Sequence, residues 1–305
     1  MALPDYQSIM LPLLECIADS KEHKMRNVTD QLAVRLGVTE EEQKELLPSG
    51  VAPVFYNRTA WAKTYLKKAG LIDSPKQGIV VISKRGLEVL NKKPGSINVK
   101  FLKQFSEFVE FQTSKREDGN FETDSNEDQS IQTPEESLEQ AYQKIRKSLA
   151  SELINKVVEL SPAFFEKLVV ELLVKMGYGG SIKDAGKAMG KSGDEGIDGT
   201  IKEDKLGLDI IYIQAKRWKP GNVVGRPELQ KFVGALAGQG AKKGIFITTS
   251  NFTKEAIEYT PRNETKIVLI DGSQLAQLMI DYNLGCTPQQ TYEVKKIDSD
   301  YFGEE

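Results

Sequence analysis

The chain has 305 residues, a length that suits about two domains of ordinary size better than one compact unit. Its 41 Lys and Arg against 44 Asp and Glu leave a net charge of −3, so any attraction to a polyanion must come from the distribution of charge. The single histidine, His23, excludes or strains serine triads, histidine-metal nucleases and His-Glu zinc proteases, because each needs a well-placed imidazole. Two cysteines far apart, Cys16 and Cys286, give neither a zinc site nor a disulfide framework. The absence of an apolar run of about 18 residues and of a signal-type start favours a cytoplasmic protein.

Charge is distributed unevenly along the chain. Residues 58–93 contain nine basic and two acidic side chains, a net charge of +7. Residues 114–140 contain two basic and nine acidic side chains, a net charge of −7, with few apolar residues. The first stretch predicts a basic surface patch. The second predicts a solvated, disordered linker without a binding role of its own.

The residues before this linker follow a mainly helical pattern. Apolar positions at helical spacing predict helices over 27–36 and 58–69. Residues 71–72 and 79–82, separated by turn residues, predict a β-hairpin, and a further helix begins near Lys84. Helix, helix and hairpin in this order indicate a winged helix, whose second helix and wing contact DNA. The cations on these two elements are the predicted DNA contacts: Arg58, Lys63, Lys67, Lys68 and Lys76. The alternative is a protein-interaction winged helix whose lysines are ordinary surface residues.

Beyond the linker, strands alternate with helices. The patterns predict, in chain order, helices over 135–160 and 162–176, a glycine-rich loop over 181–196, strands from Ile197 and over 209–216, a helix over 226–239, a strand over 244–249, a helix over 253–259, a strand over 266–270 and a helix over 273–282. Such alternation indicates an α/β sheet covered on both sides by helices.

One group of polar residues belongs to the start of this sheet. Asp198 opens the first strand, and Gln214 and Lys216 share one face of the second, because side chains alternate across a strand. If the two strands pair antiparallel, Asp198 lies near Gln214. Glu166 borders the apolar stripe of its helix and is a further contributor, since a carboxylate beside a core-facing surface usually has a partner or a role. Taken singly, Asp198 could instead stabilise a turn, and Gln214 with Lys216 could form an exposed polar strand face.

This set suits phosphodiester hydrolysis without histidine. Oxygen atoms of Asp198 and Gln214, together with a phosphate, are expected to hold Mg²⁺, which prefers oxygen ligands. The metal would acidify a bound water and neutralise charge on the scissile phosphate. Lys216 would orient that water or stabilise the transition state.

Six short blocks occur in the C-terminal half: SPAFFE (161–166), MGYGG (176–180), GDEGIDG (193–199), QAKRW (214–218), GRPEL (225–229) and GIFITTS (244–250). In their order and spacing these blocks resemble the catalytic domain of the Mrr restriction endonucleases. The N-terminal half resembles the winged-helix domain of the same family. The resemblance therefore spans nearly the whole chain except the acidic linker.

The resemblance implies a PD-(D/E)xK-type nuclease fold, in which glutamine replaces the acidic residue before x-K. By position it makes Asp198 the metal carboxylate, Gln214 and Lys216 the second-strand pair, and Glu166 the helix carboxylate. Glu195 stands where many relatives have glycine; loop variation is favoured over a role beside the metal. The expected domains are a winged helix at 1–110, a linker at 111–136 and a restriction-endonuclease-like α/β domain at 137–305.

Two cations near this centre are further predicted DNA contacts. Arg217 follows the lysine directly, and Arg226 begins a helix whose N-terminus favours phosphate; a salt bridge is the other interpretation of Arg217. The predicted function is a Mg²⁺-dependent, type IV-like restriction endonuclease for modified (methylated) foreign duplex DNA. The resemblance also suggests a homodimer or higher oligomer, in the cytoplasm with the nucleoid. A non-catalytic DNA-binding regulator is the alternative, which the joint presence of Asp198, Gln214 and Lys216 disfavours, and an RNA nuclease is a third.

Overall fold

The structure is a computed structural model of the chain, and it describes residues 3–113, 131–179, 196–204, 206–219, 221–260, 265–295 and 297. It divides into two compact units. The N-terminal unit runs as far as Lys144, and the C-terminal unit is Ile145–Lys295. No helix among the described residues is long and apolar enough to cross a bilayer.

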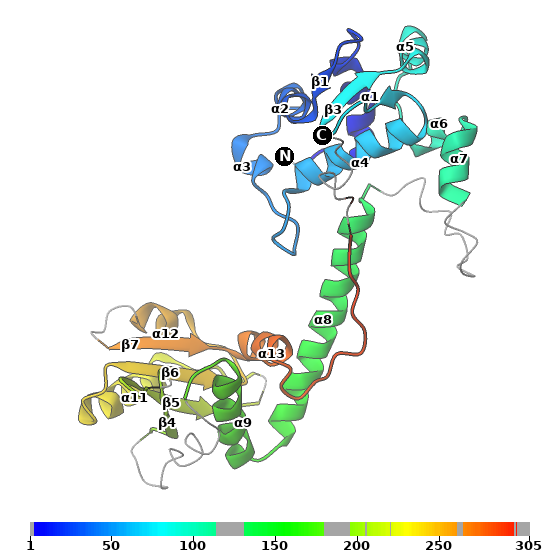
Figure 1. Cartoon of the computed structure of the whole chain (residues 1–305). Helices are drawn as coiled ribbons and strands as arrows, with labels where there is room; N and C mark the ends of the chain where they lie inside the picture. Colours follow the sequence, from blue (N-terminus) through cyan, green and yellow to red (C-terminus); the bar gives the residue numbers. More distant parts are fainter. Residues whose placement is uncertain are drawn as a thin grey trace. The chain divides into compact units, whose positions relative to one another are not determined.

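The N-terminal unit has the predicted winged-helix order with additional helices around it (Figure 1). Its elements are α1 (Tyr6–Cys16), β1 (His23–Lys24), α2 (Met25–Arg35), α3 (Glu40–Gln43), α4 (Val54–Lys68), β2 (Ile72–Asp73), β3 (Ile79–Ile82), α5 (Lys84–Asn91), α6 (Val99–Leu102) and α7 (Ser106–Thr113). The strands form an antiparallel sheet in the order β1-β3-β2. The helices expected over 27–36 and 58–69 and the hairpin are therefore confirmed, and α4 is the helix that precedes the wing.

The core of this unit lies between α1 and α4. Leu13 and Leu14 of α1 and Phe55 and Leu66 of α4 are all completely buried in one apolar cluster. Asp5 caps α1 by accepting hydrogen bonds from the backbone N–H groups that begin the helix. Burial of this apolar face is the main term that fixes the position of α4.

The helix α8 (Pro134–Glu159) begins in the N-terminal unit. Thr133 and Glu136 at its start are buried, and the unit boundary falls between Lys144 and Ile145, eight residues beyond the expected end of the linker. Hydrogen bonds from α4 to the first turn of α8 account for this difference. Most of the predicted linker, residues 114–130, lies outside the described residues.

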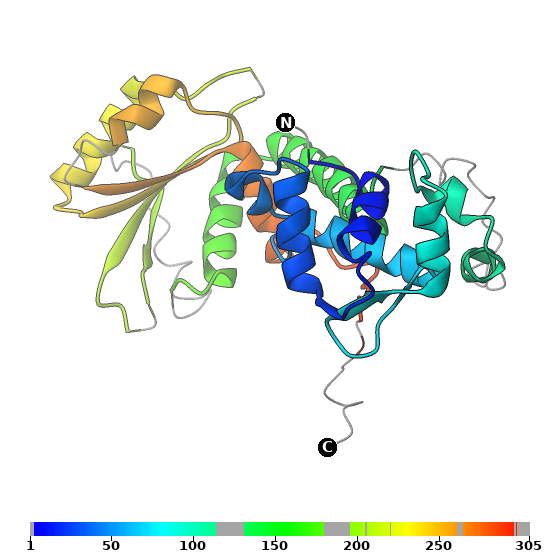
Figure 2. The same ribbon diagram turned by 90° about the horizontal axis from the view of Figure 1, so that it is seen from above.

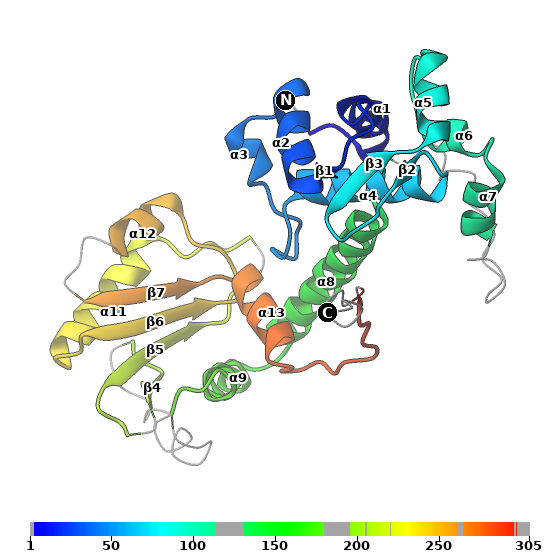
Figure 3. The ribbon, with the colours of Figure 1, turned by 45° about the horizontal axis from the view of Figure 1, so that its top comes forward.

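The C-terminal unit contains a mixed four-stranded sheet in the order β4-β5-β6-β7 (Figure 3). Its elements after α8 are α9 (Pro162–Lys175), β4 (Gly199–Lys202), β5 (Ile210–Lys216), α11 (Arg226–Gly238), β6 (Lys243–Thr248), α12 (Lys254–Tyr259), β7 (Lys266–Ile270) and α13 (Gly272–Asp281). The β4–β5 pair is antiparallel, and the other two pairs are parallel. All the helices expected in this half are present, and each strand lies within two residues of its predicted limits.

Helices cover both faces of this sheet, as predicted (Figure 2). Ile211, Ile213 and Ala215 of β5 pack with α9, α13 and the second half of α8. Tyr212 belongs to the cluster formed by α11 and α12. The alternation of β5 side chains is thus the predicted one, and the side chain of Gln214 is on the same face of the strand as that of Tyr212.

Candidate active site

Asp198 and Gln214 meet at the open end of the β4–β5 pair. The register places Gly199 opposite Ile213, and the backbone N–H of Asp198 donates to the Ile213 carbonyl at 2.9 Å. The side-chain amide of Gln214 then donates to Oδ2 of Asp198. The backbone N–H of Ala215 donates to the same oxygen at 2.7 Å. The antiparallel pairing expected from the short turn is confirmed, and it fixes the Asp198 carboxylate through two donors.

Gln214 is held in a close-packed position beside Gly196. Its side chain is only 2% exposed. Gly196 has a φ of +107°, and a Cβ at this position would lie 3.3 Å from Oε1 of Gln214. Since the amide N–H group is directed to Asp198, Oε1 is the atom of Gln214 that can serve as a ligand. Gly196 and the Ala215 amide were not identified from the sequence, because neither a backbone donor nor the absence of a Cβ gives a pattern of its own.

Glu166 and Lys216 complete the group. Burial raises the pKa of Glu166, the neighbouring Asp198 carboxylate raises it further, and Lys216 opposes both effects. These influences require the three charged groups to lie near one another. Glu166 comes from the second turn of α9, so the centre combines one helix with two strands. The structure thereby brings together all four predicted residues of this site.

Lys216 ends β5, where the parallel neighbour β6 supports it. Lys216 is paired in register with Thr248, and the Thr248 hydroxyl donates to the Lys216 carbonyl at 2.8 Å. The Thr249 hydroxyl accepts from the Trp218 N–H at 2.9 Å and donates to the Trp218 carbonyl at 2.7 Å. The hydroxyl groups of Thr248, the last residue of β6, and of Thr249, which follows it, thus hold the chain on either side of Arg217 and orient the end of β5.

The donor set is composed of oxygen atoms. Among the described residues, no group of three or more His, Cys, Asp or Glu side chains is placed to hold a metal ion. What the site offers is two carboxylates, Asp198 and Glu166, and the amide oxygen of Gln214. A hard divalent cation fits such a set, because it prefers oxygen and retains several waters. It would also offset the repulsion between the two carboxylates. Glu195 lies outside the described residues.

The predicted DNA contacts of the C-terminal unit differ in their surroundings. Arg217 is partly buried, and Nη1 donates to the Val158 carbonyl in the last turn of α8. Its Nε is buried without a hydrogen-bond partner among the described residues. Arg226 is exposed at the start of α11, with its guanidinium 5.0 Å from the ring centre of Tyr259. Arg226 thus faces solvent, whereas Arg217 fastens β5 to α8.

The predicted contacts of the N-terminal unit divide in a similar way. Lys67 and Lys68 near the end of α4 and Lys76 in the wing are exposed. Lys63 is half-buried, and burial followed by the nearby Lys67 lowers its pKa. Arg58 does not face solvent as expected. Its guanidinium lies against Glu136 and two backbone carbonyls, with 16% of the side chain exposed.

Fold and site together define the class of protein. The chain combines a winged helix with a mixed α/β unit, and carboxylates, an amide oxygen and a lysine lie together at one end of its sheet. This combination is typical of a nuclease. Residues 157–279 match the family described as "Restriction endonuclease", and residues 6–92 match the "Mrr N-terminal domain". The type IV methyl-directed restriction enzyme EcoKMrr of Escherichia coli (strain K12) is 36% identical over 309 residues, 99% of this chain and 100% of the relative. The chain belongs to the Mrr family of restriction endonucleases, which are typically metal-dependent and act on DNA.

Two solved structures of restriction enzymes are also similar. The DNA modification-dependent endonuclease AspBHI is 14% identical, with a TM-score of 0.35 over 70% of this chain and 56% of its own. The MspJI endonuclease, in complex with a 27-mer oligonucleotide, is 20% identical, with a TM-score of 0.29 over 55% of this chain and 37% of its own. The chain spans less than two thirds of the length of either.

Proposed function

We propose that this restriction endonuclease is type IV-like: it cuts methylated foreign duplex DNA, uses Mg²⁺, and does so at the centre formed by Asp198, Gln214, Lys216 and Glu166. The observation that carries the site is the pair of hydrogen bonds from Gln214 and Ala215 to one oxygen of Asp198. These bonds support the proposal because they hold the Asp198 carboxylate at a strand end, and Lys216 and Glu166 are its charged neighbours. The preference for methylated DNA is carried over from EcoKMrr, by its printed description and full-length similarity.

Each residue has a separate role in this proposal. Asp198 and the Oε1 atom of Gln214 hold Mg²⁺, with Glu166 adding negative charge nearby. The ion, when bound, supplies Lewis acidity toward a phosphate oxygen and lowers the pKa of water. Lys216 places its ammonium group where negative charge grows on the scissile phosphate, which stabilises the transition state more than the ground state. Thr248 holds the backbone of Lys216 in place.

The N-terminal unit supplies DNA affinity. In a winged helix the helix before the wing enters the major groove, and the wing contacts the backbone. Lys67, Lys68 and Lys76 are the exposed cations on α4 and the wing, and we assign them to phosphate contacts. Arg226 performs this task in the C-terminal unit. Cutting both strands of a duplex requires two scissions, which favours a homodimer or higher oligomer. The proposed location is the cytoplasm, because the DNA substrate lies there.

The test is incubation of the purified protein with methylated and unmethylated plasmid, with and without Mg²⁺. We expect cleavage of the methylated plasmid only, dependent on the metal and lost in Lys216→Ala. Binding without cleavage under all these conditions would instead identify a DNA-binding regulator. Equal cleavage of both plasmids would refute the preference for methylated DNA but not the nuclease site.

A further inference from the structure

The outward face of α4 is covered at one end. Phe55, Ala62 and Leu66 face the core and are fully buried. The opposite face, at helical spacing, contains Asn57, Ala60, Thr64, Lys67 and Lys68. All of these are exposed or half-buried except Asn57, which is 9% exposed. Something other than the core therefore buries Asn57.

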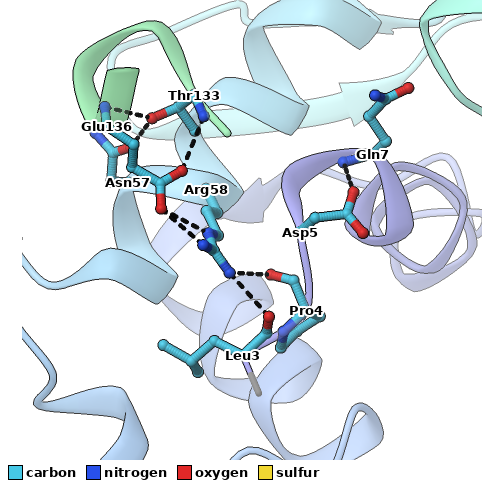
Figure 4. Close-up of polar contacts among 8 residues, drawn as sticks. All are labelled: Leu3, Pro4, Asp5, Gln7, Asn57, Arg58, Thr133 and Glu136. Carbon is cyan, nitrogen blue, oxygen red and sulfur yellow. Dashed lines mark hydrogen bonds and ion pairs between the residues drawn. The ribbon is translucent and has the colours of Figure 1, made fainter. Parts of the chain in front are cut away.

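The first turn of α8 provides this cover (Figure 4). The Thr133 hydroxyl donates to Oδ1 of Asn57 at 2.8 Å, and Nδ2 of Asn57 donates to Glu135. Thr133 and Glu136 also form a reciprocal pair, Thr133 N–H to Glu136 Oε2 at 2.8 Å and Glu136 N–H to Thr133 Oγ1 at 3.2 Å. This capping box gives the turn a defined shape. Both polar atoms of the Asn57 side-chain amide are thus hydrogen-bonded, to Thr133 just before α8 and to Glu135 in its first turn.

A second contact covers the turn that precedes α4. The backbone N–H of Ser49 donates to one carboxylate oxygen of Glu139 at 2.8 Å, and its hydroxyl donates to the other at 2.6 Å. Backbone N–H groups and serine, asparagine and arginine side chains are common donors to DNA phosphates. Here Ser49 presents two such donors to the two oxygens of a carboxylate, an arrangement that suits two phosphate oxygens equally well.

Arg58 anchors the same turn. Its Nε and Nη2 atoms donate to Oε1 of Glu136 at 3.0 and 2.7 Å. Its Nη1 atom donates to the carbonyls of Leu3 and Pro4 at 2.8 and 3.1 Å. In helix-turn-helix proteins the N-terminal residues of the recognition helix contact base edges. Three carboxylates of the first two turns of α8, Glu135, Glu136 and Glu139, therefore lie where α4 would approach DNA.

We propose that the first two turns of α8 compete with DNA within the same molecule. They occupy the start of α4 and the Ser49 turn, and duplex DNA displaces them. Phosphates and these carboxylates carry the same charge and use the same donors, so both cannot be bound at once. Displacement frees Asn57 for a base edge, and Ser49 and Arg58 for phosphates. Arg58 then becomes the DNA contact that its place in the basic stretch predicts. This inference rests on the proposed function, in that the N-terminal unit binds DNA.

The first experiment compares two double variants of the full chain. Glu135→Gln with Glu139→Gln weakens the cover but keeps Glu136 and its ion pair. Glu152→Gln with Glu159→Gln removes the same charge from the far half of α8 and is the matched control. We expect the first variant to bind a fluorescent methylated duplex about tenfold more tightly than the control, the effect of losing about one charge-assisted hydrogen bond from the closed state. Affinity equal to or weaker than that of the control overturns the proposal.

The second experiment needs no substitution. Saturating duplex should accelerate amide hydrogen exchange in residues 135–139 of the wild-type protein, because the capping box opens. Unchanged or slower exchange in this turn overturns the proposal. If wild type cuts methylated plasmid but the two double variants bind the duplex with equal affinity, the proposed competition is wrong and the proposed function stands. If neither wild type nor the variants bind or cut DNA, both fail.

Discussion

Ala215 holds Asp198 through the backbone: its N–H donates to Oδ2 of the carboxylate at 2.7 Å. Because this donor belongs to β5, an internal strand of the sheet, the carboxylate is positioned by the sheet as well as by the side chain of Gln214. A group placed so rigidly can act on a transition state without the cost of being ordered during the reaction.

Asp198→Ala and Lys216→Ala should each lower phosphodiester cleavage at least about a thousandfold, while changing DNA affinity little, because both groups act on the transition state. Nicking assays measure the first effect and gel shifts the second. Lys231→Ala, at an exposed position of α11, is the control for loss of a positive charge in this unit. If either site variant cut DNA at the wild-type rate, the active site would lie elsewhere.

Gln214→Ala should lower activity chiefly by weakening metal binding, so that raised Mg²⁺ restores part of the rate. Gln214→Glu is the informative companion, because it puts a second carboxylate within contact distance of Asp198. Like charges so close repel, and we expect this variant to melt at a lower temperature than wild type without Mg²⁺ and to recover when the ion is added. An activity loss in Gln214→Ala that no Mg²⁺ concentration relieves would argue for a purely structural glutamine.

The raised pKa of Glu166 predicts a pH dependence of stability in metal-free protein. A carboxyl group whose pKa is raised on folding stabilises the protein fully below its ordinary value of 4.5, and this contribution is lost as pH rises through the folded-state pKa. Wild type should therefore lose stability relative to Glu166→Gln as pH increases above 4.5. Urea unfolding of both proteins across this range measures the difference. A constant difference would mean that Glu166 titrates with its ordinary pKa.

The sequence predicted the proximity of Asp198 and Gln214 well because local rules determine it. Strand alternation and a short turn suffice to bring Asp198 to Gln214, and the regular pattern of the C-terminal unit left few other pairings. The environment of Arg58 could not be obtained in this way. Its partner, Glu136, lies 78 positions along the chain, within an acidic stretch whose composition predicts only a solvated linker. An Arg in a basic stretch has the same local pattern whether it faces solvent or a buried carboxylate.

This buried pair has a measurable consequence for stability. Arg58→Ala leaves Glu136 buried without its ion-pair partner, and we expect it to destabilise the N-terminal unit by about 3–5 kcal/mol. The double variant Arg58→Ala with Glu136→Gln removes the unpaired charge and should recover part of that loss. Urea unfolding of wild type, the single variant and the double variant measures these differences in stability.

A fragment ending at residue 144 should also have a higher melting temperature than a fragment ending at residue 110, which lacks Thr133 and Glu136.

The division of labour between the units predicts how affinity depends on salt. Neutralising Lys67, Lys68 and Lys76 together should weaken duplex binding and flatten its salt dependence, because each lost phosphate contact lowers the log–log slope by about 0.9. Lys202, Lys242 and Lys266 are exposed at the end of the sheet opposite Lys216, and their triple alanine variant is matched in charge. Titrations at several salt concentrations should show the smaller slope only in the first variant.

The isolated C-terminal unit should keep metal-dependent nicking of low selectivity. An unchanged slope, or full preference for methylated DNA in the isolated unit, would place recognition outside α4 and the wing.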